Sequence, residues 1–584
     1  MSELEQEEEF SFKRYFVPLT TLKAIHWIVI IGLIVYANML FNSFVWDDKS
    51  YIIQNPELSP FNPFALFGHN MFNAIGQYRP VPALYFAAIF AIFKNAQFFY
   101  HVPQLILHII NTVLVFRLFT KFFNKGISFF SSLFFLVHPL QVESVSFISA
   151  TISPLFFFFG SSALLLSIKK IQTKLTIFLT FFLIFLSLLT KETGILFLFA
   201  IFVYKLLFNK KTLLSYLWLG LLTVSAYFLI RFFIGSVGFY RLLLIPISRL
   251  SLLERILNMP AILYYYISNV FFPNAISHNQ LWLTQNTDFI SFYFRLIMDL
   301  LFFLAIAITG FTLFKKKREA FKLYIFFLAW FVLGLGMHSQ LIPLDETVSD
   351  RWFYFPIVGV IGMLAAFAQA YRAFLFNHIQ IIIMLCIVII TAFSVRTIIR
   401  NTDWKDGITL YTHDMKISDN FDIEDNLGVE YFEQGNYHQA ITHFKKSYEM
   451  FPYEVNAYNI ALAYVQLGEY TNAEIYYDKS LQEKDYADTT HQHELGNYES
   501  YAQLLLHSKK YQKARKIVQG GIKDYPSTKD LWMFLAYAQY QIGDKKDALS
   551  AAQKAVTLEP SNSQAQALYD TISHNKQVLL KPIK

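Results

Sequence analysis

Long apolar stretches recur through the first 400 residues and then stop, and this pattern limits the possible folds more than any other feature. About eleven of the stretches approach the ~20 residues that a helix needs to cross a bilayer. Apolar residues make up 55% of the 584-residue chain and charged residues only 16%, a balance that is unusual for a soluble protein. The sequence therefore predicts an integral membrane protein with many spanning helices.

The apolar stretches divide into full-length spans and shorter segments. The predicted spans are residues 24–41, 102–120, 127–140, 145–168, 175–190, 193–208, 213–233, 294–314, 321–336, 357–373 and 379–399. Two further segments, 81–93 and 261–272, are shorter than a comfortable span. We expect these two to form helices that lie along the membrane interface or re-enter it.

Lysines and arginines in the short loops predict the orientation, because such residues collect on the cytoplasmic side. A cytoplasmic N-terminus places one set of basic loop residues on that side: Lys121, Lys125, Lys169, Lys170, Lys174, Lys210, Lys211, Lys315, Lys316, Lys317, Arg318 and Arg372. The opposite, outer face then receives the loop after the first span, the loop after Phe233, the stretch 337–356 and everything after Arg400.

The N-terminal segment is acidic and lacks both the basic region and the cleavage site of a signal peptide. The first span is therefore expected to act as an uncleaved anchor. Together with the compact loops, this favours a bacterial inner membrane with the C-terminal part in the periplasm. In a eukaryotic cell the same part would lie in the lumen.

After residue 400 the sequence repeats itself with a period of about 34 residues, which is typical of tetratricopeptide helix pairs. Three later units follow the spacing of the first. The first unit carries small and aromatic residues at fixed offsets, with a proline at its end: Gly428, Tyr431, Gly435, Tyr437, Ala440, Phe444 and Pro452. Such arrays form a superhelix with a concave groove that usually binds peptide segments. We expect the groove near Asn426, Tyr458 and Asn459 to bind a protein acceptor; an array without a ligand is the alternative.

These patterns divide the chain into five parts. They are a cytoplasmic tail (1–23), a transmembrane domain (24–400), a linker (401–420), about four repeats (421–562), and a capping helix with its tail (563–584). The predicted fold class is all-α.

Two adjacent aspartates, Asp47 and Asp48, follow the first span. A carboxylate at the bilayer edge is costly unless it is hydrogen-bonded, neutralised or hydrated. Repulsion between neighbouring carboxylates, together with partial desolvation, can prepare one of them to act as a general base. The sequence predicts this catalytic role for the pair, whereas the structural alternative is a solvated turn beside Lys49.

Other polar residues of the outer face are candidates for binding a donor. His138 and Glu143 lie at an outer helix entrance, where Glu143 could orient a donor hydroxyl or a metal ion; a purely structural pairing is the alternative. Lys191 and Glu192 are a second candidate pair, with an interfacial ion pair as the alternative.

Arginines occur on the outer face, where basic residues are least expected. Arg241, Arg249 and Arg255 lie in the loop region after Phe233, and Arg351 precedes an aromatic cluster. Guanidinium groups bind phosphate through paired, charge-assisted hydrogen bonds. We expect one or more of them to hold a lipid phosphate; the alternatives are anionic headgroups for the first three and a pair with Asp350 for Arg351.

Several classes of site have no counterpart in the sequence. There is no HExxH motif, no DxD motif in an outer loop and no Cys/His cluster, so we expect no metal or other cofactor to be required. A divalent ion held by Asp48 and Glu143 is the alternative. The single cysteine, Cys386, lies in an apolar run, which excludes an intrachain disulfide. No basic patch indicates a nucleic-acid partner.

The order of these elements resembles the GT-C glycosyltransferases, which take sugars from polyprenyl-phosphate carriers at the outer face of a membrane. In particular it resembles the branch that carries tetratricopeptide repeats and includes protein O-mannosyltransferases. The resemblance covers nearly the whole chain and rests on these elements: Asp47 with Asp48, Arg79 with Pro80, His108 with Asn111, His138 to Glu143, Lys191 to Gly194, Asp350 to Pro356, and the repeats.

The resemblance implies a GT-C-type helical membrane domain followed by a tetratricopeptide solenoid, and an inverting transfer. An acidic residue of the first outer loop would deprotonate an acceptor hydroxyl, which attacks the anomeric carbon and expels a lipid phosphate. Asp47 fits this role first and Asp48 second, with Arg79 among the donor-binding residues. The chain departs from the family pattern at Ala150 to Pro154, where an acidic or basic residue often occurs.

The leading hypothesis is therefore a transferase that moves a sugar from a polyprenyl-phosphate lipid to a Ser or Thr hydroxyl of a protein held by the repeats. A non-catalytic membrane scaffold for envelope assembly is the main alternative. A transporter of lipid-linked sugars would need polar residues through both leaflets, and the inner halves of the spans are apolar.

Overall fold

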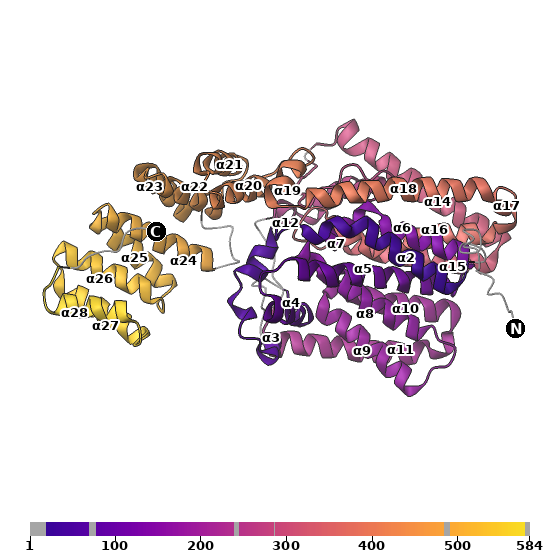
Figure 1. Ribbon diagram of the computed structural model, residues 1–584, viewed down its shortest axis with the longest axis horizontal. Coiled ribbons are helices and arrows are strands. Elements are labelled where there is room, and N and C mark those ends of the chain that lie inside the picture. The colour runs from indigo at the N-terminus through magenta and orange to yellow at the C-terminus, as the bar shows by residue number, and fades with distance from the viewer. Residues whose placement is uncertain (1–18, 69–76, 239–244, 285, 484–490, 578–584) are drawn as a thin grey trace, which may run out of the picture. The chain divides into compact units, whose positions relative to one another are not determined.

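The computed structural model describes residues 19–68, 77–238, 245–284, 286–483 and 491–577, and the chain divides into two compact units. The first unit ends at Ser418 and the second begins at Asp419. Both are helical (Figure 1). Within the described ranges the only β-pairing is an isolated antiparallel bridge between Gln280 and Val348. The predicted all-α fold class is confirmed.

Eight helices of the described ranges, counted with the short turns that extend them, are long and apolar enough to cross a membrane. They are α2 (Thr21–Tyr36), α5 (Phe98–Phe119), α8 (Ile152–Ser167), α11 (Leu213–Leu229), α14 (Phe294–Lys316), α15 (Arg318–Met337), α16 (Pro356–Ala370) and α18 (Ile379–Asp403). The other three predicted spans correspond to shorter helices: α6 (Lys125–Val137), α9 (Lys174–Thr190) and α10 (Ile195–Phe208). The long helices of this unit run roughly parallel to one another (Figure 1).

One of the two predicted interfacial segments is a longer helix than expected. Residues 81–93 lie in α4 (Pro80–Phe93), but 261–271 lie in α13 (Leu252–Phe271), which begins nine residues earlier than predicted. Its start is fixed by a capping box between Ser251 and Glu254, which satisfies two free backbone N–H groups. The apolar criterion missed the first half because polar residues such as Arg255 and Asn258 are buried there.

Close contact between helices holds the core of the first unit together. A Cβ atom added to Gly359 of α16 would lie 2.5 Å from the backbone nitrogen of Phe331 in α15. A Cβ on Gly160 of α8 would likewise overlap the ring of Phe197 in α10. Small residues at such positions let helices pack at backbone distance, as is common between membrane helices.

Short helices and turns connect the long helices. They are η1 (Ala37–Phe41), η2 (Lys49–Ile53), η3 (Pro56–Leu58), α3 (Pro63–Gly68), η4 (Pro139–Gln141), α7 (Val142–Ser146), η5 (Ile148–Thr151), η6 (Glu192–Gly194), η7 (Lys210–Thr212), η8 (Ile230–Ile234), α12 (Pro246–Arg249), η9 (Phe289–Tyr293), η10 (Asp350–Tyr354), α17 (Arg372–Phe376) and α19 (Gly407–Asp414). Most of the polar residues singled out above lie on or beside these elements.

The second unit consists of antiparallel helix pairs. They are α20 (Phe421–Glu433) with α21 (Tyr437–Met450), α22 (Glu454–Gln466) with α23 (Tyr470–Gln482), α24 (His491–His507) with α25 (Tyr511–Asp524), and α26 (Lys529–Ile542) with α27 (Lys545–Leu558), followed by α28 (Ser563–Ser573). In three pairs the turn contains a glycine with positive φ: Gly435, Gly468 and Gly543. Only glycine adopts that conformation without strain. In the remaining pair, α24 with α25, Lys509 adopts it instead, with φ of 56°.

Candidate active site

The two adjacent aspartates have different environments, and Asp48 is the one held by hydrogen bonds. Its side chain is fully buried. One carboxylate oxygen accepts hydrogen bonds from the backbone N–H of Ser149, at 2.7 Å, and from the Ser149 hydroxyl. The other oxygen accepts one from the Val45 N–H at 3.2 Å. Burial raises the pKa of Asp48 to about 7, against the lowering effect of these hydrogen bonds. Asp48 therefore joins the first loop to the turn that precedes α8.

Asp47 is available for chemistry. Its side chain is half-buried, and its carboxylate has no hydrogen-bond or ion-pair partner among the residues that the structure describes. Burial raises the pKa of Asp47 to about 6; the positive charge of Arg351 opposes this shift and the negative charge of Asp345 adds to it. At pH 7 the carboxylate is thus mostly ionised, yet more basic than an exposed aspartate, as a general base requires.

Trp46 fixes the direction of the loop just before Asp47. Its backbone has φ of 50°, a left-handed conformation that is strained for a bulky residue. The indole ring is held on several sides. It stacks on Phe147 with centroids 5.4 Å apart, meets the His278 ring edge at 4.9 Å and lies 5.4 Å from the guanidinium carbon of Arg351.

The same loop is anchored to the end of the last spanning helix. The Asn42 side chain donates to the Asn401 carbonyl at 3.0 Å, and the Ser43 N–H donates to the Lys405 carbonyl at 2.9 Å. These bonds, together with those of Asp48, hold the loop that carries Asp47 from two directions.

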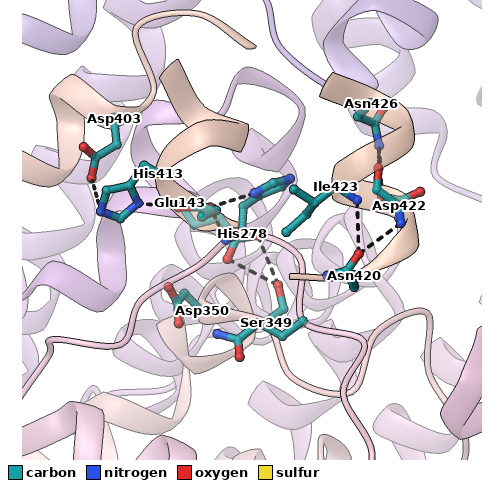
Figure 2. Close-up of polar contacts among 12 residues, drawn as sticks. Glu143, His278, Ser349, Asp350, Asp403, His413, Asn420, Asp422, Ile423 and Asn426 are labelled. Atoms are coloured by element: carbon teal, nitrogen blue, oxygen red, sulfur yellow. Dashed lines mark hydrogen bonds and ion pairs between the residues drawn. The ribbon is translucent and has the colours of Figure 1, made fainter. Parts of the chain in front are cut away.

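A buried ion cluster lies next to Trp46. The Asp414 carboxylate accepts hydrogen bonds from both terminal nitrogens of Arg400, and from the backbone and ring of His278. The His413 ring lies 3.4 Å from the Asp403 carboxylate (Figure 2) and 2.6 Å from that of Asp414. Although burial has the opposite effect, the positive charge of Arg400 holds the pKa of Asp414 well below its usual range. This cluster fixes His278 against the Trp46 ring.

The contacts of Asp48 predict that replacing it destabilises the protein more than replacing Asp47 does. Replacing Asp48 with alanine removes the partner of three donors, which should lower the free energy of unfolding by about 1–3 kcal/mol. Asp47→Ala should change it by less than about 0.5 kcal/mol, because no partner is lost. Thermal unfolding of both variants in the same detergent checks this, and equal losses would contradict the assignment.

A group of cations surrounds Glu192. Arg79 donates to one carboxylate oxygen at 3.0 and 3.2 Å, and Arg231 to the other at 3.2 Å. Burial raises the pKa of Glu192, but the charges of the two arginines outweigh this effect and the pKa is lowered. Glu192 thus forms ion pairs with two arginines, and the group as a whole is positive.

Lys191 adds a third cation, with which no carboxylate among the described residues forms an ion pair. Its ammonium lies 3.4 Å from the Ser153 hydroxyl and above the ring of Phe156. Burial, followed by the positive charges of Arg79 and Arg351, lowers the pKa of Lys191 to about 7. An anion bound here would reverse that shift, so the arrangement suits a phosphate.

Arg351 belongs to a second group of charges. One nitrogen of its guanidinium donates a hydrogen bond to Glu143, and another donates one to Glu346. Glu143 also accepts from the Arg351 N–H at 2.9 Å and from the Ser349 hydroxyl at 3.0 Å (Figure 2). Asp350 instead accepts from the Tyr265 hydroxyl. Glu143 of α7 thus pairs with residues of another element, which fits the structural pairing that was its alternative, whereas the alternative pair of Arg351 with Asp350 is not formed.

Electrostatic effects connect Asp47 with both groups of charges. The pKa of Lys191 responds to Arg79 and to Arg351, and the pKa of Asp47 responds to Arg351. Burial, and then the charge of Asp47, raise the pKa of the Tyr51 hydroxyl. The structure thus brings together six of the residues singled out from the sequence: Asp47, Arg79, Glu143, Lys191, Glu192 and Arg351.

The other four predicted donor-binding residues are not among these six. Three of them lie in other parts of the fold, and the fourth is outside the described residues. His138 accepts from the Leu140 N–H at 3.2 Å and donates to the Val270 carbonyl at 2.9 Å; burial lowers its pKa to about 4. Arg255 donates to the carbonyls of Gln340, Leu250 and Leu341. Arg249 ends α12, and Arg241 lies outside the described residues. These four residues are therefore not part of the proposed site.

Sequence reasoning missed Arg231, Asp345 and Glu346. Arg231 is an isolated charge at the end of an apolar run, a signal that indicates function in membrane proteins. Asp345 and Glu346 are adjacent acids in the loop 337–356, so the argument applied to the pair Asp47 and Asp48 would also have found them.

Metal ligands do not gather in the described part of the chain, where no group of three or more His, Cys, Asp or Glu side chains could hold an ion. The three residues predicted for acceptor binding have contacts within the second unit. Asn426 donates to Asp422 (Figure 2), Asn459 donates to Asp425 at 3.0 Å, and the Tyr458 hydroxyl lies 3.2 Å from that of Ser500.

Comparisons with known proteins agree with this organisation. Residues 79–234 match the family described as dolichyl-phosphate-mannose-protein mannosyltransferase, residues 426–488 match the tetratricopeptide repeat, and residues 466–555 match anaphase-promoting complex, cyclosome, subunit 3.

Similar proteins occur among animal proteins. The chain is 25% identical to protein O-mannosyl-transferase TMTC3 of Homo sapiens over 93% of its own length and 65% of that protein. It is 28% identical to protein O-mannosyl-transferase F38B6.6 of Caenorhabditis elegans over 29% of its own length and 26% of that protein. The chain thus spans somewhat less than two thirds of the human relative. These matches confirm the predicted resemblance to the repeat-bearing O-mannosyltransferase branch.

Proposed function

We propose that this protein is a membrane glycosyltransferase that moves mannose from a polyprenyl-phosphate lipid to a Ser or Thr hydroxyl of a protein. The observation that carries the proposal is Asp47: a half-buried carboxylate without a partner among the described residues, in the same outer region as the net positive group that Arg79, Arg231 and Lys191 form around Glu192. The relatives' names support mannose and a protein acceptor. A scaffold without activity would gain nothing from such an arrangement, since partly desolvated charges are costly.

The donor phosphate would bind to Lys191 and Arg79. No carboxylate among the described residues pairs with Lys191, and its pKa is lowered first by burial and then by the charges of Arg79 and Arg351, an effect that a bound anion would oppose. Arg79 uses two of its donors on Glu192, and its guanidinium carries further donors. The phosphate is the leaving group of the reaction, so the same cations stabilise the charge that grows on it as the bond to the sugar breaks.

Asp47 would act as the general base. Its carboxylate takes the proton of the acceptor hydroxyl, whose oxygen forms the new bond to the anomeric carbon. The bond between that carbon and the phosphate oxygen breaks at the same time, its electron pair leaves with the polyprenyl phosphate, and the configuration inverts. The chain's own cations supply the positive charge of this scheme, so we propose a reaction that needs no metal ion.

The repeats would present the protein acceptor, with the groove near Asn426, Tyr458 and Asn459 as its binding surface. Peptide binding is the common use of such grooves. We further propose that the site and the repeats lie on the non-cytoplasmic side, as the distribution of basic loop residues predicts.

Reconstituted protein tests the proposal. Purified wild type in lipid nanodiscs, given polyprenyl-phosphate mannose and a Ser/Thr-rich acceptor protein, should add single hexose units that mass spectrometry locates on hydroxyl side chains. EDTA should leave the rate unchanged. Donor binding without any transfer to a panel of acceptors would contradict the transferase.

The pH dependence of kcat/KM should be bell-shaped with a narrow maximum between about pH 6 and 7. Activity falls as the pH drops through the pKa of Asp47, about 6, because the protonated acid cannot accept a proton. It also falls as the pH rises through the pKa of Lys191, about 7, because the neutral amine no longer attracts phosphate. Lys191→Arg should remove the alkaline decline and keep the acid one; a profile unchanged by that substitution would contradict the role of Lys191.

A further inference from the structure

The loop between α15 and η10 is built to hold a fixed shape. Gln340 has φ of 62°, a strained conformation for a residue with a side chain. Its fully buried amide accepts from the Leu344 N–H at 3.0 Å and donates to the carbonyls of Glu346 and Thr347, at 2.6 and 3.0 Å. One side chain thus closes the loop around Asp345.

Contacts from other elements fix the loop in place. Arg255 of α13 donates to the Gln340 carbonyl at 2.9 Å, and the Thr347 N–H donates to the Gln280 carbonyl at 2.9 Å. Glu346 is held by Arg351. Arg255, expected from the sequence to bind phosphate, is therefore a support of this loop.

Asp345 is the one acidic residue of this loop without such a contact. Its side chain is half-buried, and it forms no hydrogen bond or ion pair with any residue that the structure describes. Its negative charge nevertheless raises the pKa of Asp47, and it also raises the pKa of Lys191 against the lowering effect of burial. The contacts of its neighbour agree: Glu346 pairs with Arg351, whose guanidinium lies 5.4 Å from the ring of Trp46, the residue before Asp47. Asp345 therefore lies near the proposed base, and its charge reaches the proposed phosphate site, without contacting either.

That position has a consequence for the proposed reaction. In a donor, the sugar is joined to the phosphate on one side and faces the acceptor hydroxyl on the other. If the phosphate binds at Lys191 and the hydroxyl at Asp47, a group close to both must face the sugar. A carboxylate there can only accept hydrogen bonds, and sugar hydroxyls are donors.

We propose that Asp345 is a specificity-determining residue whose carboxylate accepts hydrogen bonds from hydroxyl groups of the donor sugar. This inference rests on the proposed function. The hydroxyl that Asp345 binds then contributes to the choice of sugar, because a donor lacking it leaves a half-buried carboxylate unpaired.

Deoxy donors test the contact in a double-mutant cycle. The kcat/KM of wild type and Asp345→Ala is measured with polyprenyl-phosphate mannose and with its 2-, 3-, 4- and 6-deoxy analogues. Asp345→Ala should lower kcat/KM with the parent donor by about 10- to 100-fold, as expected for charge-assisted hydrogen bonds. At one position the deoxy analogue should lower the wild-type value similarly, and Asp345→Ala should then add little further loss.

Controls separate the possible failures. Asp547→Ala, an exposed aspartate of α27, should leave all values unchanged, and an unchanged unfolding midpoint shows that Asp345→Ala is folded. Equal deoxy effects in wild type and Asp345→Ala at every position would overturn the inference while transfer itself persists. Wild type that does not bind the parent donor would overturn the proposed function as well. Wild-type activity that requires added Mg²⁺, with the requirement lost in Asp345→Ala, would assign the carboxylate to a metal and overturn the sugar contact.

Discussion

Replacing Asp47 with asparagine should lower kcat by about 10²- to 10⁴-fold, the usual contribution of a general base. The amide has nearly the same shape but cannot take the acceptor proton. Because Asp47 has no partner among the described residues, the protein should fold with an unchanged unfolding midpoint. Initial rates of hexose transfer, measured at saturating donor and acceptor, provide the test.

Asp47→Glu is the matched variant, since it keeps the carboxylate but moves it by one methylene group. It should retain more activity than Asp47→Asn and keep the acid decline of the pH profile. Full activity of Asp47→Asn at normal protein levels would show that another group accepts the proton.

Replacing Arg351 with methionine should produce the largest loss of stability. Methionine fills a similar volume but leaves Glu143 and Glu346, both buried, without their shared guanidinium. Removing one partner of a buried ion pair typically costs about 3–5 kcal/mol, because the remaining charge stays desolvated. The measurement is the unfolding midpoint in nanodiscs, compared with wild type at the same pH.

Two further variants identify the cause of that loss. Arg351→Lys should recover only part of the stability, because one ammonium cannot reproduce the fork that reaches two carboxylates. The triple variant Arg351→Met, Glu143→Gln, Glu346→Gln also neutralises the two acids. It should be more stable than Arg351→Met alone, since neither acid is then left as an unpaired charge. A midpoint unchanged by Arg351→Met alone would show that these ion pairs contribute nothing.

The architecture could be predicted because its signals are local. A spanning helix shows as a continuous apolar run and a repeat as a period, so neither depends on distant residues. The start of α13 could not be predicted in this way. Its polar residues Arg255 and Asn258 are buried against other elements, and only the fold reveals those partners.

The site was predictable by chemical type but less so by residue. Asp47 and Asp48 are equivalent in the sequence, and only the contacts of Asp48 with Ser149 and Val45 distinguish the hydrogen-bonded acid from the one without a partner among the described residues. His138 was selected for the same reason as Glu143, yet its ring is occupied by two backbone groups. Hydrogen bonds to the backbone cannot be inferred from a pattern of side chains. Sequence reasoning therefore overestimates how many polar side chains are available to bind a ligand.

Measuring donor binding and sugar transfer separately in two variants tests the central claim most directly. Asp47→Asn should bind polyprenyl-phosphate mannose with wild-type affinity and fail to transfer the sugar, whereas Lys191→Met should lose affinity for the donor. That division would assign the base and the phosphate site to the two residues. Wild-type transfer by Asp47→Asn, together with wild-type donor affinity in Lys191→Met, would contradict the account.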